Sequence, residues 1–361
     1  MKTKFQFSLA IIALLVFMPS VSSGNQDEFV KEYKKDYAAG KNTQLEISNK
    51  YGDVDIKDWN NESVAIEVKV IVRGDNKEKA DRVFDCIQIH FEQEGDIIRA
   101  TTEFTDNISD FFRGFSDDEK SLEVNYSVFM PKTVPLNLSN KYGSVFINEL
   151  ASTSTIDVKY GKLTANKILH DSQQPLTKVV LGYSNATIQE CKWVKMDIKY
   201  SKIQIVQSKA IIMQSKYSKV YVDNGSSLIC ESKYDTYELG KLNNLVATAG
   251  YTHFKIAELS NKLQIESKYT DVEIENVPAG FEQIKIDNSY GSYKIGIIQD
   301  ASYRIDGNAR YCKINYPEDN GRVNRFNENN EMKVNGLIGR DEGTKSSVIV
   351  NSSYGNVRLV K

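Results

Sequence analysis

The chain has 361 residues, of which 40% are hydrophobic and 26% are charged, and this excludes both a polytopic membrane protein and a disordered chain. Its 46 Lys and Arg against 48 Asp and Glu give a net charge of −2, so the basic field typical of nucleic-acid-binding proteins is missing and nucleic acid is not an expected partner. The 20 Tyr against 2 Trp and 6 Pro favour a strand-rich protein.

The first 23 residues have the pattern of a signal peptide. Lys2 and Lys4 are followed by a nearly continuous apolar stretch over 7–18, and small residues around Ser23 fit a cleavage site. The stretch is shorter than the roughly 20 residues that cross a bilayer, and no later segment approaches that length. We therefore expect an exported chain, in the periplasm or at the cell surface, with no membrane-spanning segment after cleavage.

One short pattern centred on tyrosine recurs along most of the chain. The spacing is 17 residues from each copy to the next between Tyr183 and Tyr251, and insertions lengthen it elsewhere. Twelve tyrosines occupy equivalent positions: Tyr51, Tyr142, Tyr160, Tyr183, Tyr200, Tyr217, Tyr234, Tyr251, Tyr269, Tyr290, Tyr311 and Tyr354.

Apolar residues alternate with polar ones on both sides of the tyrosine. Val220 and Val222 illustrate the positions after it, and Leu263 and Ile265 those before it. A period of two indicates a strand on each side. The phase changes just after the tyrosine, where glycine or serine is typical of a turn, as at Gly143.

A unit of this size cannot bury its own apolar face and has to stack on copies of itself. The sequence therefore predicts an all-β fold, a single-stranded parallel β-helix (β-solenoid) of about 17-residue coils that lie about 4.8 Å apart. Equivalent tyrosines would then form a ladder at one corner. Because they share parity with the apolar positions before them, we expect the rings to pack inward or at the corner, with each hydroxyl reaching water or a polar neighbour; the alternative is an outward ladder on which sugar rings stack.

The gap of 91 residues between Tyr51 and Tyr142 predicts an insertion. We divide the chain into the signal peptide (1–23), an N-terminal segment with the first coil (24–59), an inserted β-α-β module (60–131) and the β-helix proper (132–361). A capping pattern at Asp75 to Glu78 places one helix in the module at about 75–87. An irregular insertion is expected within the β-helix at about 317–345.

Three segments carry a resemblance to a known family. Thr43 to Trp59, the helix with Lys79 and Ala80, and the closing Ser352 to Val357 are similar to the bacterial "putative adhesin" family of exported β-strand-repeat proteins. The resemblance covers essentially the mature chain. It implies an adhesin-like β-helix of the cell envelope and supplies no catalytic residue.

Two surface features are candidate binding sites. A lysine precedes the tyrosine in many units, and the candidate stripe for an anionic polysaccharide or lipid headgroup consists of Lys159, Lys199, Lys216, Lys233 and Lys268. Acidic residues two positions earlier, such as Asp197, would neutralise this stripe and leave an ordinary solvated face. In the loop 105–120, Phe111, Phe112 and Phe115 form either a partner contact or a flap on a sheet edge.

Catalytic chemistry has little support in the sequence. No group of acids departs from the repeat to form a glycosidase-like or calcium site, and His90, His170 and His253 fall at unrelated positions. The four cysteines lack metal-binding spacing; we expect buried thiols, and one disulfide remains open. We therefore predict no catalytic residue, metal or cofactor.

The leading functional hypothesis is a non-catalytic, exported adhesin-like or envelope-scaffold protein that binds a glycan or another surface component. Two alternatives are a polysaccharide lyase or hydrolase on the same scaffold, and an envelope-stress or regulatory accessory protein.

Overall fold

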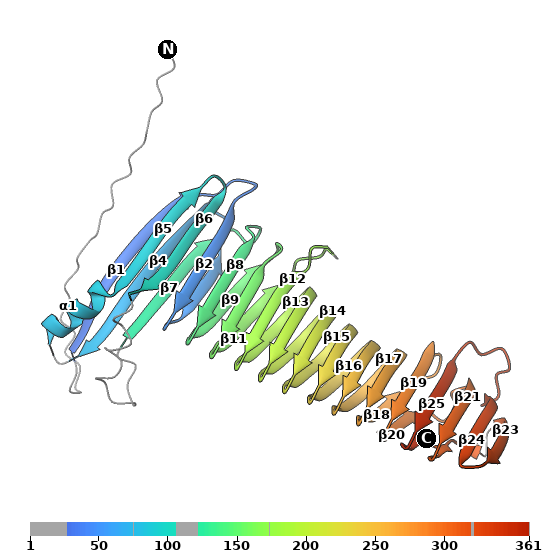
Figure 1. Ribbon diagram of the computed structural model, residues 1–361. Helices are drawn as coiled ribbons and strands as arrows, with labels where there is room; N and C mark the ends of the chain where they lie inside the picture. The colour runs from blue at the N-terminus through green and yellow to red at the C-terminus, as the bar shows by residue number, and fades with distance from the viewer. Residues whose placement is uncertain (1–26, 75, 106–121, 173, 319–320, 361) are drawn as a thin grey trace.

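A computed structural model describes residues 27–74, 76–105, 122–172, 174–318 and 321–360. In these residues it places 26 strands and one α-helix, and hydrogen bonds join the strands into one long, largely parallel sheet. Figure 1 shows the strands following one another from the blue N-terminal end to the red C-terminal end. The fold is therefore nearly all-β, as the period-two pattern predicted. The expected signal peptide lies outside the described residues.

Two stacks of strands run along the molecule, and the repeat units contribute segments to both. The approach stack holds the segments that run into the repeat tyrosine, and the departure stack holds those that leave it. In spatial order the approach stack contains β2 (Gln44–Lys50), β8 (Leu136–Lys141), β10 (Thr155–Lys159), β12 (Thr177–Gly182), the second halves of β13 (Asn185–Lys199), β14 (Lys202–Lys216), β15 (Lys219–Lys233), β16 (Thr236–Gly250) and β17 (His253–Lys268), then β19 (Gln283–Ser289), β25 (Ser347–Ser353) and β21 (Tyr303–Arg310). The departure stack contains β3 (Val54–Asp58), β9 (Ser144–Leu150), β11 (Lys162–Ile168), the first halves of β13 to β17, then β18 (Asp271–Val277), β20 (Tyr293–Ile297), β26 (Val357–Val360) and β22 (Ile314–Asn315).

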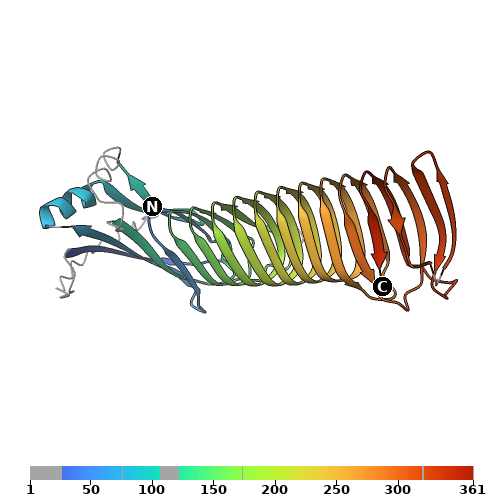
Figure 2. The same ribbon diagram turned by 90° about the horizontal axis from the view of Figure 1, so that it is seen from below.

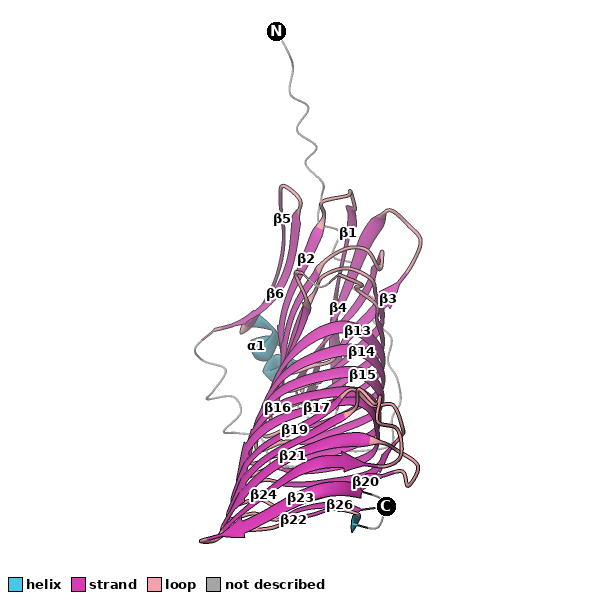
Figure 3. Ribbon diagram, turned by 90° about the vertical axis from the view of Figure 1, so that its right-hand side faces the viewer, coloured by secondary structure: helices cyan, strands magenta, loops and turns pink. Residues whose placement is uncertain are grey.

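Equivalent residues of neighbouring units lie in register. Lys199 pairs with Lys216, which pairs in turn with Lys233, and the successive strands β13 to β17 lie over one another in Figure 3. The longer connection between β11 and β12 does not shift this register, because Gly182 still lies between Lys159 and Lys199. Insertions therefore leave the stacks as loops, and the surface rows continue past them.

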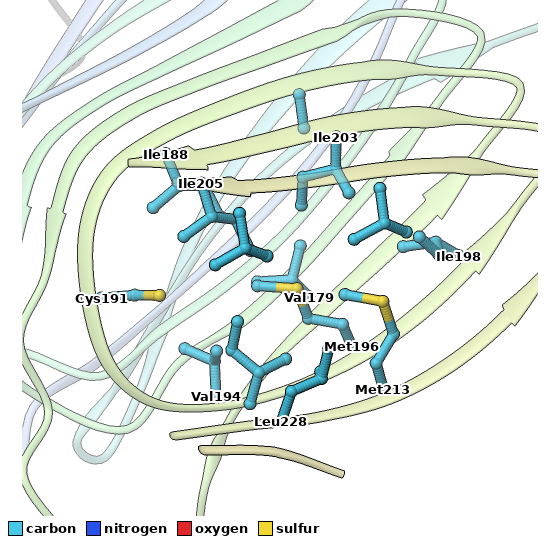
Figure 4. Close-up of a cluster of buried hydrophobic side chains, with 14 of the residues drawn as sticks. Val179, Ile188, Cys191, Val194, Met196, Ile198, Ile203, Ile205, Met213 and Leu228 are labelled. Carbon is cyan, nitrogen blue, oxygen red and sulfur yellow. The ribbon is translucent and has the colours of Figure 1, made fainter. Parts of the chain in front are cut away.

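The hydrophobic core lies between the two stacks. In Figure 4, Ile188 and Ile205 of the departure stack and Met196 and Ile198 of the approach stack point into the same enclosed space. All four are fully buried. Burying an aliphatic side chain of this size contributes about 1.5–3 kcal/mol, so the in-register aliphatic rows are the main stabilising feature of the repeat.

The N-terminal module extends both stacks rather than standing beside them. It consists of β1 (Asp27–Ala38), β4 (Ser63–Gly74), α1 (Lys77–Asp85), β5 (Ile87–Glu94), β6 (Ile97–Phe104) and β7 (Leu122–Met130). Strand β6 pairs parallel to β2 and β7 pairs parallel to β3, and antiparallel strands β5, β4 and β1 continue outward. The expected helix lies at α1, where the Asn76 side chain accepts a hydrogen bond from the Lys79 amide at 2.9 Å and Ala80 and Val83 are buried.

The C-terminal units are not stacked in chain order. Strand β25 inserts between β19 and β21, and β26 inserts between β20 and β22. The last unit in the sequence is therefore not the last unit in the two stacks, because the unit of β21 and β22 lies beyond it. Figure 2 accordingly shows the C-terminus short of the end of the sheet. The segment expected to be irregular forms a regular hairpin of β23 (Gly321–Glu328) and β24 (Glu331–Ile338), and β24 pairs antiparallel with β21.

Candidate functional site

The twelve repeat tyrosines share one backbone conformation. Their φ angles lie between 50° and 63°, in the left-handed region that non-glycine residues rarely occupy. This conformation breaks the strand alternation at the tyrosine itself, so the side chain turns outward. Eleven of the twelve rings are exposed, with exposed fractions from 40% to 55%. Packing of the rings into the core, the inward form of the prediction, is therefore wrong, whereas the predicted ladder at the corner is confirmed. We call these twelve residues the tyrosine ladder.

The rings of the tyrosine ladder stack on one another without interruption. Eleven successive pairs have ring centroids 4.8–5.2 Å apart and interplanar angles of 2–19°. At the N-terminal end, Phe104 packs edge-on against Tyr51 at 5.5 Å. Each inner ring is thus covered on both faces and exposes its edge. A sugar cannot stack on an inner ring without separating two neighbours, so the ladder is not a platform of open ring faces.

Stacking offsets the strain of the left-handed backbone. That conformation costs a residue other than glycine about 1–2 kcal/mol. A stacked aromatic pair contributes about 0.5–1.5 kcal/mol beyond the area it buries, and each inner tyrosine makes two such pairs. The two terms are of similar size, which explains how tyrosine can occupy a position where glycine or asparagine would be expected.

Replacing an inner ring tests this balance. We expect Tyr217→Asn to lower the free energy of unfolding by about 1–3 kcal/mol, because asparagine tolerates the left-handed backbone but makes neither stacking contact. Tyr217→Phe keeps the ring and should change that free energy by less than about 0.5 kcal/mol. Urea unfolding measures both values. Equal losses in the two variants would show that the hydroxyl, rather than the stacking, stabilises the ladder.

A second row of polar groups lies in the turn just after each tyrosine. The Ser201 hydroxyl accepts a hydrogen bond from the Ser184 amide at 3.1 Å and donates to the Lys199 carbonyl at 2.7 Å. At Gly291, where glycine occupies this position, the side-chain amide of Asn288 acts instead and donates to the Gly291 carbonyl at 2.8 Å. Both devices satisfy backbone groups that the turn removes from water.

Asp235 is the one acidic residue in this turn position, and its side chain is buried. Its carboxylate accepts hydrogen bonds from the hydroxyls of Ser215 and Ser232, each at 2.7 Å, and from the amides of Ser218 at 2.7 Å and Lys233 at 3.0 Å. A buried carboxylate is stable only with such a set of donors. The buried Asp235 side chain therefore holds its own turn and the neighbouring turn together through these hydrogen bonds.

Two further buried groups border this network. The Tyr237 hydroxyl lies within hydrogen-bond distance of Ser215, and burial raises its pKa well above the usual value. Burial also raises the pKa of the Cys230 thiol to about 12. Both groups are therefore neutral at physiological pH, and the Asp235 carboxyl group already has four hydrogen-bond donors. This arrangement stabilises the fold and offers no reactive group to solvent.

The register brings the predicted lysine stripe onto one outer row beside the tyrosine ladder. Lys159 pairs with Asp157 at 3.1 Å and Lys199 with Asp197 at 3.4 Å, as the neutralising alternative expected. The ammonium groups of Lys216 and Lys233 lie over the rings of the tyrosines that follow them, at 5.6 and 5.5 Å. In the part of the chain that the structure describes, Lys216, Lys233 and Lys268 make no salt bridge with a carboxylate.

The stripe is interrupted rather than continuous. Gly182 separates Lys159 from Lys199, and Gly250 separates Lys233 from Lys268. Three of its lysines, Lys199, Lys216 and Lys233, lie on adjacent strands; we call them the lysine triplet. A second such run on the same row joins Lys159 to Lys141 and Lys50. Like charges on neighbouring strands destabilise a sheet, so the triplet keeps a positive charge at some cost in stability.

An open hollow of about 510 Å³ lies where the stripe ends. The row continues past Lys268 with Ser289 and Ser353 before it reaches Arg310, and the missing long side chains leave the space. Asp287 and Asn351, hydrogen-bonded at 2.8 Å, also line it. The sequence did not reveal this hollow because it depends on β25 lying between β19 and β21.

The remaining predicted groups lie elsewhere or outside the described residues. Phe111, Phe112 and Phe115 belong to the residues that the structure does not describe, so the partner-contact loop stays a prediction. The three histidines lie apart in the sheet and its connections, and His90 lies 3.5 Å from the carboxylate of Glu103. Within the described ranges, no three His, Cys, Asp or Glu side chains are grouped to hold a metal ion, and no helix there is long and apolar enough to cross a membrane.

All four cysteines are free thiols. Cys191 and Cys230 are buried, as expected, whereas Cys86 and Cys312 are half-buried. The disulfide that the sequence left open is not formed.

Comparison with known proteins identifies similar solved structures. No protein-family model matches the sequence, and no curated protein does. Similar structures include a putative adhesin from Parabacteroides distasonis, with 13% identity, 68% of this chain and 97% of that chain covered, and a TM-score of 0.40. Another is a putative adhesin from Parabacteroides merdae, with 13% identity, 68% and 96% covered, and a TM-score of 0.37. A putative lipid binding protein from Parabacteroides distasonis has 10% identity, 71% and 96% covered, and a TM-score of 0.33. The first two carry the same description as the family that the sequence resembles.

Proposed function

We propose that this chain is an exported, non-catalytic, adhesin-like protein that binds an anionic glycan of the cell envelope or of another cell surface. The observation that carries the proposal is the lysine triplet, in which one basic residue recurs in register on adjacent strands. A linear polymer with regularly spaced anionic groups can contact several of these lysines at once, so individually weak contacts add up. The signal-peptide pattern of residues 1–23 supports export to the periplasm or the cell surface.

We further infer that the two stacks are the two faces of a single-stranded parallel β-solenoid. In β14, residues 202–208 pair within the departure stack and residues 210–216 pair within the approach stack. One strand thus passes from one face to the other before the chain turns at Tyr217 into the next unit. Such a scaffold is rigid along its length because each unit is hydrogen-bonded on both sides, and it would hold the lysines of the triplet at a fixed spacing.

Charge reversal tests the proposed binding surface. The variant Lys199→Glu, Lys216→Glu, Lys233→Glu should lose binding to acidic glycans by at least about tenfold, because three attractive contacts become repulsive. Wild-type binding should also weaken as salt is raised, since exposed charges are screened. A glycan array with the mature protein, followed by titration of the best ligand at several salt concentrations, measures both effects.

A matched control separates the site from net charge. Lys178, Lys195 and Lys241 are exposed and lie outside the triplet, so changing all three to glutamate alters the net charge equally. This control should retain glycan binding. Equal loss in both triple variants would refute a local site, and turnover of a bound glycan by the wild-type protein would refute the non-catalytic proposal.

A further inference from the structure

The tyrosine ladder combines three properties that seldom occur together. The twelve phenol rings are consecutive neighbours, their planes are nearly parallel at 4.8–5.2 Å, and eleven of them are exposed at the surface. The register of the two stacks fixes which rings are neighbours. Every inner ring therefore has two phenols within reach and remains accessible to a reagent in solution.

Stacked, accessible phenols are suited to oxidative coupling. Removing one electron and one proton from a tyrosine gives a phenoxyl radical whose unpaired electron is shared with the ring carbons next to the C–O bond. Two such radicals combine by forming a carbon–carbon bond between these positions, and the ring hydrogens then migrate to the oxygens and restore both phenols. The product is dityrosine, and the pair has lost two electrons and two protons.

We propose that the tyrosine ladder is an oxidative cross-linking site, at which a peroxide-driven haem peroxidase couples neighbouring tyrosines of one chain into dityrosine. Each tyrosine of the ladder is called a rung below. Hydrogen peroxide accepts the two electrons and two protons and becomes two molecules of water. The new bond joins neighbouring repeat units covalently along the outer edge, where otherwise only stacking holds the rings together. This inference does not depend on the proposed glycan binding.

The order of the rungs gives the proposal a specific signature. Tyr354 stacks between Tyr290 and Tyr311, at 4.9 Å from each, although it follows both in sequence. Coupling within the ladder must therefore link Tyr290 to Tyr354 and Tyr311 to Tyr354, and must not link Tyr290 to Tyr311. At the other end, Tyr51 stacks on Tyr142 at 5.2 Å and should couple to it, whereas Phe104, which packs against Tyr51 at 5.5 Å, has no hydroxyl to oxidise.

Tyrosines outside the ladder provide an internal comparison. Tyr126, Tyr237, Tyr293 and Tyr303 are buried in the core and should stay unmodified. The half-buried thiols of Cys86 and Cys312 would compete for the oxidant, so the experiment uses a protein in which both are changed to serine.

The experiment treats this protein, at a dilution that keeps it monomeric, with a haem peroxidase and limiting hydrogen peroxide. We expect dityrosine fluorescence, a loss of two hydrogen masses per link in the intact chain, and no covalent dimer on a denaturing gel. Peptide mapping should find the links between neighbouring rungs, including both links to Tyr354. Links mainly between chains, links between rungs that do not stack, or oxidised rungs without any link would each overturn the proposal.

Two single variants sharpen the result. Tyr354→Phe keeps the stacking ring and should abolish both links to residue 354 while the other links remain. Tyr221→Phe alters a tyrosine outside the ladder and should leave the pattern of links unchanged. If Tyr354→Phe instead produced a Tyr290–Tyr311 link in similar yield, the fixed order of rungs would not control the coupling and the proposal would fail.

Discussion

Replacing Asp235 with leucine should destabilise the protein more than most substitutions at a turn. Leucine accepts no hydrogen bond, so the hydroxyls of Ser215 and Ser232 and the amides of Ser218 and Lys233 all lose the acceptor that the structure gives them. Each hydrogen bond to a buried charged group contributes about 1.5–3 kcal/mol. Allowing for rearrangement of the two hydroxyls, we expect the free energy of unfolding to fall by about 4 kcal/mol or more.

The repeat itself supplies the control. Serine occupies the same turn position in the preceding units, as at Ser201 and Ser218, and there its hydroxyl accepts from a backbone amide and donates to a carbonyl. Asp235→Ser should therefore retain most of the stability. Urea unfolding measures the free energies, and hydrogen exchange of the Ser218 and Lys233 amides reports the local effect. Unchanged exchange in Asp235→Leu would mean that the carboxylate does not hold this turn.

The second large effect is expected at a glycine that contacts another glycine. A Cβ atom added to Gly143 would lie 1.9 Å from the Gly52 carbonyl oxygen, and one added to Gly161 would lie 2.0 Å from the Gly143 carbonyl oxygen. These are backbone atoms of turns that are held between paired strands, so no flexible side chain can move aside. We expect Gly143→Ala to lower the free energy of unfolding by about 3 kcal/mol or more, the upper range for overpacking.

Gly250→Ala is the matched variant with the opposite expectation. A Cβ atom at Gly250 would have no neighbouring atom within 4 Å, and alanine restricts the unfolded chain more than glycine does. Its free energy of unfolding should stay the same or rise by about 0.5 kcal/mol. Chemical denaturation of both variants decides the question: a similar loss in the two would show that glycine is needed for its backbone flexibility rather than for close approach.

The repeat was predictable because its signal is local and repeated. The alternation around residues such as Val220 and Val222 fixes which side chains are buried, and the structure buries both. The aliphatic core follows directly from this pattern. The pattern placed Asp235 in the turn with Ser201 and Ser218, but its network of buried donors could not be inferred without the two stacks.

The orientation of the tyrosines was not predictable in the same way. Parity placed them inward because the turn was assigned to the residues after the tyrosine, whereas the left-handed backbone lies at the tyrosine itself. Tyrosine has no intrinsic preference for that conformation, so its own propensity gives no warning. The strain of the left-handed backbone is offset by stacking with tyrosine rings of other units. This stabilisation depends on how the units are placed next to one another, so the sequence of a single unit does not reveal it.

The position of the last unit was equally hidden. The segments around Tyr311 and Tyr354 share the alternation of apolar and polar residues, and that alternation does not decide which one stacks on Tyr290. The hairpin β23–β24, which intervenes between them in sequence, lets the chain return and insert the final unit. The polar hollow beside Lys268 exists only as a result of that return.

This returning C-terminus has a consequence for the order in which the chain can fold. A solenoid built strictly in order can fold from its N-terminus as each unit emerges, but here β21 and β22 have no inner neighbour until residues 347–360 arrive. Vectorial folding must therefore pause after β19 and β20, and the complete end forms in a single late step. A chain truncated shortly before Ser347 would lack β25 and β26, the strands through which β21 and β22 join the rest of the two stacks.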